Sequence, residues 1–154
     1  MLHLKNDPAQ NMGNTGYGNR QGFRFVLSTD STGRALGAGS LQALNIGTQV
    51  AVGVLPEGLR ITDSQVLVTD AMGAGVTAKL GFVYADGVDS NAVPQDAAYF
   101  GTGLALSAVA RLRNAVAKAS HKLPKPALVV LEIAGANVAE SGRVEVHIEG
   151  VTEG

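Results

Sequence analysis

Histidine and carboxylate side chains alternate near the end of the chain and form its densest group of chemically capable residues. His147 is flanked at two-residue spacing by Glu145 and Glu149, which places all three on one face if the segment is a β-strand. Imidazole and carboxylate groups bind metal ions and transfer protons. One histidine between two carboxylates on a single strand is not a complete ligand set, so we expect this face to be solvated. The other histidines, His3 and His121, stand apart from it.

A second group of oxygen-bearing side chains lies in one short segment. It contains Asp86, Asp89, Asn91 and Asp96, and carboxylate and amide oxygens are the ligands that calcium prefers. Their spacing differs from that of an EF-hand, and the closing bidentate glutamate is missing. Turn formation explains the same residue types equally well. The sequence therefore predicts a polar turn here and no metal site.

The residue types behind other common reactions are missing. The chain has no cysteine, and none of its serines stands in a Gly-x-Ser-x-Gly turn. Its glycine-rich stretches lack the lysine and the serine or threonine of a phosphate-binding loop. We therefore predict that the chain is not an enzyme and that it uses no cofactor.

Basic residues gather in one stretch that could meet an acidic partner or a nucleic-acid backbone. The stretch comprises Arg111, Arg113, Lys118, His121, Lys122 and Lys125. The net charge is −1, tryptophan is absent and aromatic residues are scarce, which argues against attraction to nucleic acid and against base stacking. We predict no nucleic-acid partner and expect the stretch to be solvated or to face another subunit. Arg111 and Arg113 are candidate interface residues.

The low charge content of the chain predicts that part of its surface is covered. Charged residues make up 16% of the 154 residues, against about 25% in a typical soluble protein, and the mean hydropathy is positive. Because obligate interfaces resemble a protein core, we expect a homo-oligomer or an assembly component. The alternative is that alanine and glycine raise the hydropathy without creating adhesive patches. No apolar run reaches the length of a membrane span or of a signal peptide, so no membrane partner is predicted.

The elements that must position these residues are short β-type runs separated by glycine, proline and aspartate turns. Strands are predicted over residues 22–28, 49–55, 59–69, 76–84, 127–134 and 143–151. The apolar parity changes within 59–69, which predicts a bulge near Asp63 and Ser64. The run 127–134 is almost continuously apolar, which is typical of a central strand. The sequence thus predicts an all-β fold, an antiparallel β-sandwich or jelly roll of about seven or eight strands.

The segment from Tyr99 to Ala119 fits two kinds of secondary structure. Leu104, Ala108 and Leu112 align at four-residue intervals, as on one face of a helix, and the alanine content also favours a helix. The same residues alternate with polar ones, as in a strand. The β-rich surroundings lead us to predict a strand over residues 104–113.

Residues 1–20 differ from the rest and are predicted to form an extended N-terminal arm before a single β-sandwich domain at residues 21–154. The segment is rich in asparagine, glycine and glutamine and has no hydrophobic period, so it cannot bury enough apolar area to fold alone. It is either a frayed terminus or an arm that becomes ordered against a partner. Its candidate anchors for a partner interface are Leu2, Leu4, Met12, Tyr17 and Arg20.

Three segments together resemble a known group of proteins. They read LPEGLRITDSQVLV, VTAKLGFVYADG and LVVLEIAGANVAESGRVEVHIEGV. The chain from about Val50 to Val151 resembles the small β-sandwich structural proteins of tailed bacteriophages, above all capsid decoration (cement) proteins. This resemblance implies a jelly-roll-like sandwich, often trimeric, that binds between major capsid protein subunits. It also implies a place on the capsid exterior of the virion, after synthesis in the host cytoplasm, and no catalytic residues.

Three functions therefore remain open for this chain. The first is a capsid decoration protein whose partners are the major capsid protein and other copies of itself. The second is a tail, fibre or head–tail component with a receptor contact, for which exposed aromatic loops would speak. The third is a cupin-like enzyme or small-molecule binder, which needs inward-facing histidine or glutamate residues.

Overall fold

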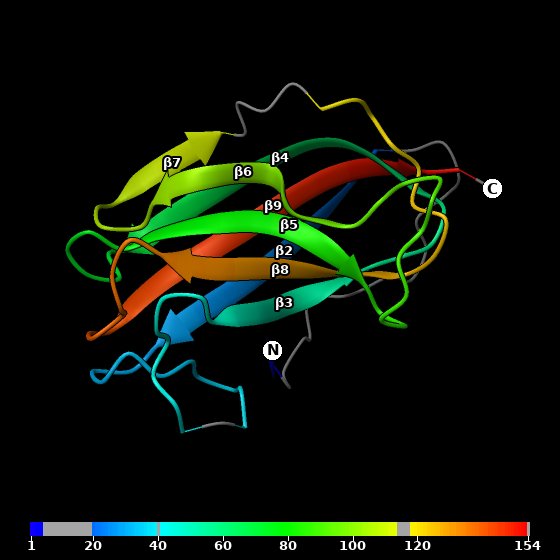
Figure 1. The fold of residues 1–154 in the computed structure, drawn as a ribbon. Coiled ribbons are helices and arrows are strands. Elements are labelled where there is room, and N and C mark those ends of the chain that lie inside the picture. The colour runs from blue at the N-terminus through cyan, green and yellow to red at the C-terminus, as the bar shows by residue number, and fades with distance from the viewer. Residues whose placement is uncertain (5–19, 40, 114–117, 154) are drawn as a thin grey trace.

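Two β-sheets packed face to face make up the described part of the chain (Figure 1). The computed structural model describes residues 1–4, 20–39, 41–113 and 118–153. Its strands are β1 (Leu2–His3), β2 (Arg20–Thr29), β3 (Gln49–Leu55), β4 (Leu59–Asp70), β5 (Thr77–Tyr84), β6 (Asp96–Ala105), β7 (Ala110–Arg113), β8 (Ala127–Ala134) and β9 (Gly142–Thr152). Within these described ranges no helix has the length and apolar character needed to cross a membrane.

The strand order is that of a jelly roll. Sheet A has the order β1-β3-β8-β5-β6, and sheet B has the order β2-β9-β4-β7. Every pairing between strands is antiparallel except that of β1 with β3, which is parallel. Without β1, each sheet has four strands, which is the eight-stranded double-sheet architecture. The all-β sandwich predicted from the sequence is therefore confirmed.

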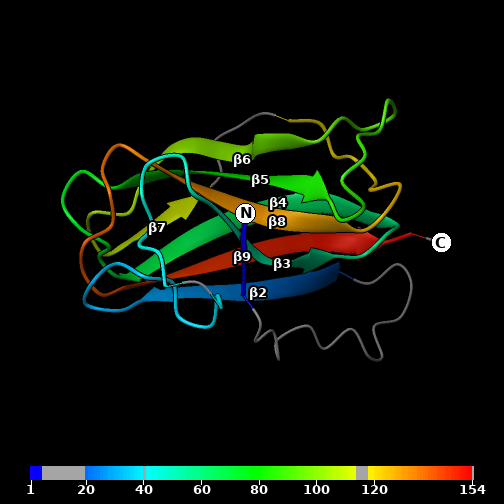
Figure 2. The same cartoon turned by 60° about the horizontal axis from the view of Figure 1, so that its bottom comes forward.

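The core lies between the sheets and is built by the alternation seen in the sequence. Phe23, Phe25 and Leu27 of β2 are buried opposite Ile148, Val146 and Val144 of β9, their partners in the register. In β5 the inward residues are Ala78, Leu80, Phe82 and Tyr84. Strand β8 lies between β3 and β5, as its continuous apolar run predicts. Figure 2 shows the two layers with the flank formed by β3 and β2 brought forward, and β1 pairs with β3 at this edge of sheet A.

Bulges explain two departures from simple alternation. In β4 the register with β9 shifts between Ile61 and Asp63, next to the predicted position, so that Leu59 and Ile61 face the core together with Val66 and Val68. In β3 a shift between Ala51 and Gly53 was not predicted. It turns Val54 to the outer face of sheet A, whereas simple alternation would place Val54 on the same face as Val50 and Val52.

Residues 104–113 contain β-structure, as predicted, and not a helix. The prediction of one continuous strand is wrong, because two strands share this segment. Strand β6 ends at Ala105 in sheet A, and β7 begins at Ala110 in sheet B. Between them Leu106 is fully buried; its N–H donates to the Val76 carbonyl and its carbonyl accepts from Met72 N–H, both at 2.9 Å. These bonds hold the point at which the chain crosses from one sheet to the other. Residues 96–103, left as loop or ambiguous by the sequence, belong to β6.

Candidate partner interfaces

The first two predicted anchors of the N-terminal arm contact the chain's own core. Leu2 and His3 pair with Val50 and Ala51 of β3, and the N–H of Leu4 donates to the Ala51 carbonyl at 3.4 Å. Leu2 and Leu4 are half-buried and pack against the core cluster. A role for these two leucines in a partner contact stays a prediction. Met12 and Tyr17 lie outside the described residues.

The other predicted interface residues share the outer face of sheet B with most of the chain's arginines. The chain has seven arginines, and the strand registers place six of them on this face: Arg20, Arg24, Arg60, Arg111, Arg113 and Arg143. Sequence analysis named three of the six. It missed the others because residues far apart in sequence become neighbours only through the strand order β2-β9-β4-β7.

Five of these six arginines have an acidic partner, and for three of them the partner stands on a neighbouring strand. Arg20 pairs with Glu149, and Arg113 Nη1 lies 3.3 Å from Asp63 Oδ2. Arg111 instead donates to the side-chain oxygen of Gln65 at 2.9 Å. Exposed pairs of this kind contribute little to stability. They do, however, fix the planar guanidinium groups in position. The guanidinium group of arginine is suited to recognise carboxylates on a partner.

Glu145 lies at the centre of this charged face. Arg24 donates to both of its carboxylate oxygens, at 2.9 and 2.5 Å, while Arg143 lies 3.5 Å away and His147 Nε2 3.2 Å away. These hydrogen bonds, that of Arg24 above all, lower the pKa of Glu145 to about 2. The Glu145 side chain is only 13% exposed. The prediction that this whole row faces water is therefore wrong at Glu145 and His147, because long side chains from β2 and β4 flank the central strand β9.

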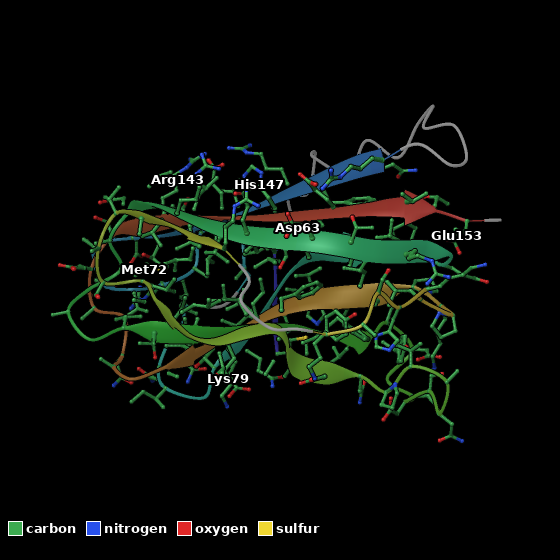
Figure 3. The ribbon with its side chains drawn as sticks, turned by 90° about the horizontal axis from the view of Figure 1, so that it is seen from above. Asp63, Met72, Lys79, Arg143, His147 and Glu153 are labelled. Atoms are coloured by element: carbon green, nitrogen blue, oxygen red, sulfur yellow. The ribbon has the colours of Figure 1, made fainter. Side chains whose placement is uncertain are left out.

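The outer face of sheet A has the opposite character. Val54, Leu128 and Val83 form an apolar row across β3, β8 and β5, and all three are half-buried. The same three strands also carry one polar row, formed by Gln49, Glu132 and Lys79. In it Glu132 accepts hydrogen bonds from Gln49 and from Lys79, both at 2.8 Å. In Figure 3, Lys79 lies on the sheet A side and Arg143 and His147 on the sheet B side. The almost continuous apolar run of β8 is the sequence signal for this apolar row, because such a run places apolar residues such as Leu128 on the outer face of the strand as well as on the inner face.

Two ion pairs join the oxygen-rich segment to the basic stretch. Lys125 lies 2.7 Å from Asp86, and Lys118 lies 2.8 Å from Asp96. Asp89 accepts from the backbone N–H groups of Ser90 and Gln95, both at 2.7 Å, which confirms the turn interpretation. Within the ranges that the structure describes, no three histidine, aspartate or glutamate residues are grouped as metal ligands.

The histidine of the basic stretch, His121, contacts an aromatic side chain. His121 Nδ1 lies 3.0 Å from the hydroxyl of Tyr99, which donates to the Ala119 carbonyl at 2.8 Å. Tyr99 is buried, and burial raises the pKa of its hydroxyl. Tyr99 and Lys118 line two adjoining hollows of about 210 and 320 Å³. No local sequence pattern indicates this contact, because it joins β6 to the segment before β8.

Comparison with known proteins gives matches to solved structures only. No protein family model and no curated protein matches the chain. A chain from the capsid of Ralstonia phage GP4 matches with a TM-score of 0.66 and 16% identity over 95% of each chain. A chain from the capsid asymmetric unit of cyanophage Pam1 matches with a TM-score of 0.56 and 14% identity, over 97% of this chain and 99% of that one. The protein therefore shares its fold, over nearly its full length, with chains found in phage capsids.

Proposed function

We propose that the protein is a non-enzymatic structural component of a phage virion. In this proposal it decorates the capsid exterior and stabilises the shell by binding between major capsid protein subunits. The observation that carries the proposal is the near-complete, two-way coverage of the match to the capsid chain of phage GP4. The similarity extends over the whole unit and leaves out no domain of either chain.

The two unlike outer faces support a protein that works by contact. The apolar row of Val54, Leu128 and Val83 on sheet A suits burial against another copy, because obligate interfaces resemble a core. The arginine-rich face of sheet B suits a partner that presents carboxylates. Each contact can be weak, since many copies bound to one lattice gain avidity.

The oligomeric state can be measured on the purified protein alone. We expect a trimer, with a mass close to three times 15.7 kDa, by light scattering after size exclusion. Replacing Leu128 with lysine on the outer face of sheet A should convert the trimer to monomers, whereas Thr69→Lys on the outer face of sheet B should leave it intact. A wild-type protein that is monomeric at all concentrations tested would contradict the self-association part of the proposal.

Binding to the shell tests the proposal itself. The purified protein is added to empty shells assembled from the major capsid protein of the phage genome that encodes it, and the shells are sedimented. We expect saturable co-sedimentation at a fixed ratio of copies to capsid subunits, together with a higher melting temperature of the shells. Protein that stays in the supernatant at every concentration would overturn the proposed function.

A further inference from the structure

One end of the sandwich is formed by four loops that contact one another. They comprise residues 30–48 without residue 40, 71–76, 106–109 and 135–141, all at the left of Figure 1. We call this surface the loop end. Met72 N–H bonds to the Leu106 carbonyl, a Cβ built at Gly75 would lie 3.6 Å from Ala136, and Val138 N–H bonds to the Leu44 carbonyl. The four loops therefore form one continuous surface.

Large apolar side chains are exposed on this loop end. The described residues include six exposed large hydrophobic side chains, and four of them lie here: Leu36 at 55%, Leu41 at 81%, Ile46 at 59% and Val109 at 71% exposure. The charged residues of the four loops are Asp30, Arg34 and Glu140, whereas the loops at the opposite end carry Glu57, Asp86, Asp89, Lys118, Lys122 and Lys125. Depletion of charge around exposed apolar residues is the composition of an interface centre.

Hydrogen bonds hold both ends of the loop that carries three of these side chains. Asp30 Oδ1 accepts from the N–H and hydroxyl of Thr32 and from Arg34 N–H, at 2.7 to 3.1 Å. Leu44 is fully buried, and Ile46 N–H donates to the side-chain oxygen of Asn137 at 2.8 Å. These bonds fix the backbone beside Leu36 and Ile46 before binding, which lowers the ordering cost of a contact made there.

We propose that the loop end docks into an apolar, uncharged hollow on a different protein chain. This inference rests on the proposed function, under which that chain is the major capsid protein. Leu36, Leu41 and Ile46 project from the surface, so a partner must supply the hollows. Two larger hollows among the described residues, one beside Lys118 and one beside Lys122, lie at the opposite end and have charged walls. A second copy offering either of them would place charges against apolar side chains.

The test measures binding of two variants to the same assembled shells. Leu41→Asp/Ile46→Asp changes the loop end, and Val88→Asp changes a side chain that is equally exposed, at 62%, in a loop at the opposite end. Because all three positions are exposed, the melting temperature should stay within about 2 °C of wild type, as expected for surface changes. We expect the double variant to bind at least about tenfold more weakly, which corresponds to about 1.4 kcal/mol, and Val88→Asp to bind like wild type.

Three results would overturn the inference, and only the third would also overturn the proposed function. If the wild type and the double variant bind the shells equally, the loop end is not the docking surface, while the proposed function stands. If the double variant loses its own oligomeric state in light scattering, the loop end covers a second copy instead. If the wild type does not bind the shells, the proposed function fails and this inference fails with it.

Discussion

Gly53 occupies a point where the two sheets come close together. A Cβ atom built at this position would lie 2.1 Å from ring carbons of Phe25, which is fully packed in β2 of the opposite sheet. The β3 bulge turns this residue inward. We therefore expect Gly53→Ala to lower the free energy of unfolding by about 1–3 kcal/mol, the usual cost of overpacking a core, as measured by urea denaturation.

Gly22 in β2 supplies the matched control for this substitution. A Cβ atom at Gly22 would meet no atom within 4 Å, so Gly22→Ala should change stability by less than about 0.5 kcal/mol, as surface changes usually do. If both substitutions changed the free energy of unfolding equally, the close approach of Phe25 would not be the reason for a glycine at position 53.

The charge cluster around Glu145 predicts a dependence of stability on pH. Its pKa is lowered from 4.5 to about 2 in the folded protein, chiefly by Arg24, so the unfolded chain binds a proton more readily. This group therefore stabilises the fold fully above about pH 5, and the contribution is lost as the pH falls from there to 2. Because the cluster is near the surface, we expect about 1–2 kcal/mol from it.

Glu145→Gln isolates this contribution. The variant should be less stable than wild type at pH 7, and the difference between the two should shrink towards pH 2, when unfolding is followed by circular dichroism. Glu57→Gln, which removes an exposed carboxylate from the turn before β4, should leave the pH profile of the wild type unchanged. A difference for Glu145→Gln that stays constant from pH 7 to pH 2 would contradict the account.

At the scale of elements, β1 is the smallest strand and offers a test of its packing. Leu2 and Leu4 pack against the core, whereas His3 between them is exposed. We expect Leu2→Asp/Leu4→Asp to lower the free energy of unfolding by about 1–2 kcal/mol, in line with loss of partly buried apolar area. His3→Asp should have almost no effect. If His3→Asp destabilises the protein as much as the double variant, β1 does not pack as described.

Most elements could be predicted because their patterns are local. The alternation in residues 22–28, 76–84 and 143–151 identifies β2, β5 and β9 from their own residues. The division between β6 and β7 depends on bonds from Leu106 to Val76 and Met72. No pattern within residues 104–113 reveals those distant partners, so the sequence could not predict where the chain changes sheets.

The candidate interfaces were less predictable than the fold for the same reason. Arg111 and Arg113 were found because they are close in sequence, but Arg24 and Arg143 join them only through the order of strands in sheet B. Leu36, Leu41 and Ile46 lie between the predicted strands 22–28 and 49–55, in a segment of small residues with no strand pattern. Their exposure is a property of the folded loop, which residues 135–141 contact at Leu44 and Ile46, and sequence patterns do not show it.

At the scale of the whole molecule, the protein differs from face to face and from end to end. Sheet A has an apolar row on its outer face beside one polar row, sheet B has an arginine-rich outer face, and the loop end exposes apolar side chains opposite a charged end. Such a distribution fits a protein with several distinct neighbours better than one surrounded by water.

The most direct test of the proposed virion role is cryo-electron microscopy of phage particles produced from the genome that encodes this chain. The account predicts repeated jelly-roll density on the outer surface of the shell, between major capsid subunits, with the loop end directed at the shell. Virions with a bare capsid surface, or with this jelly roll only in the tail, would contradict it.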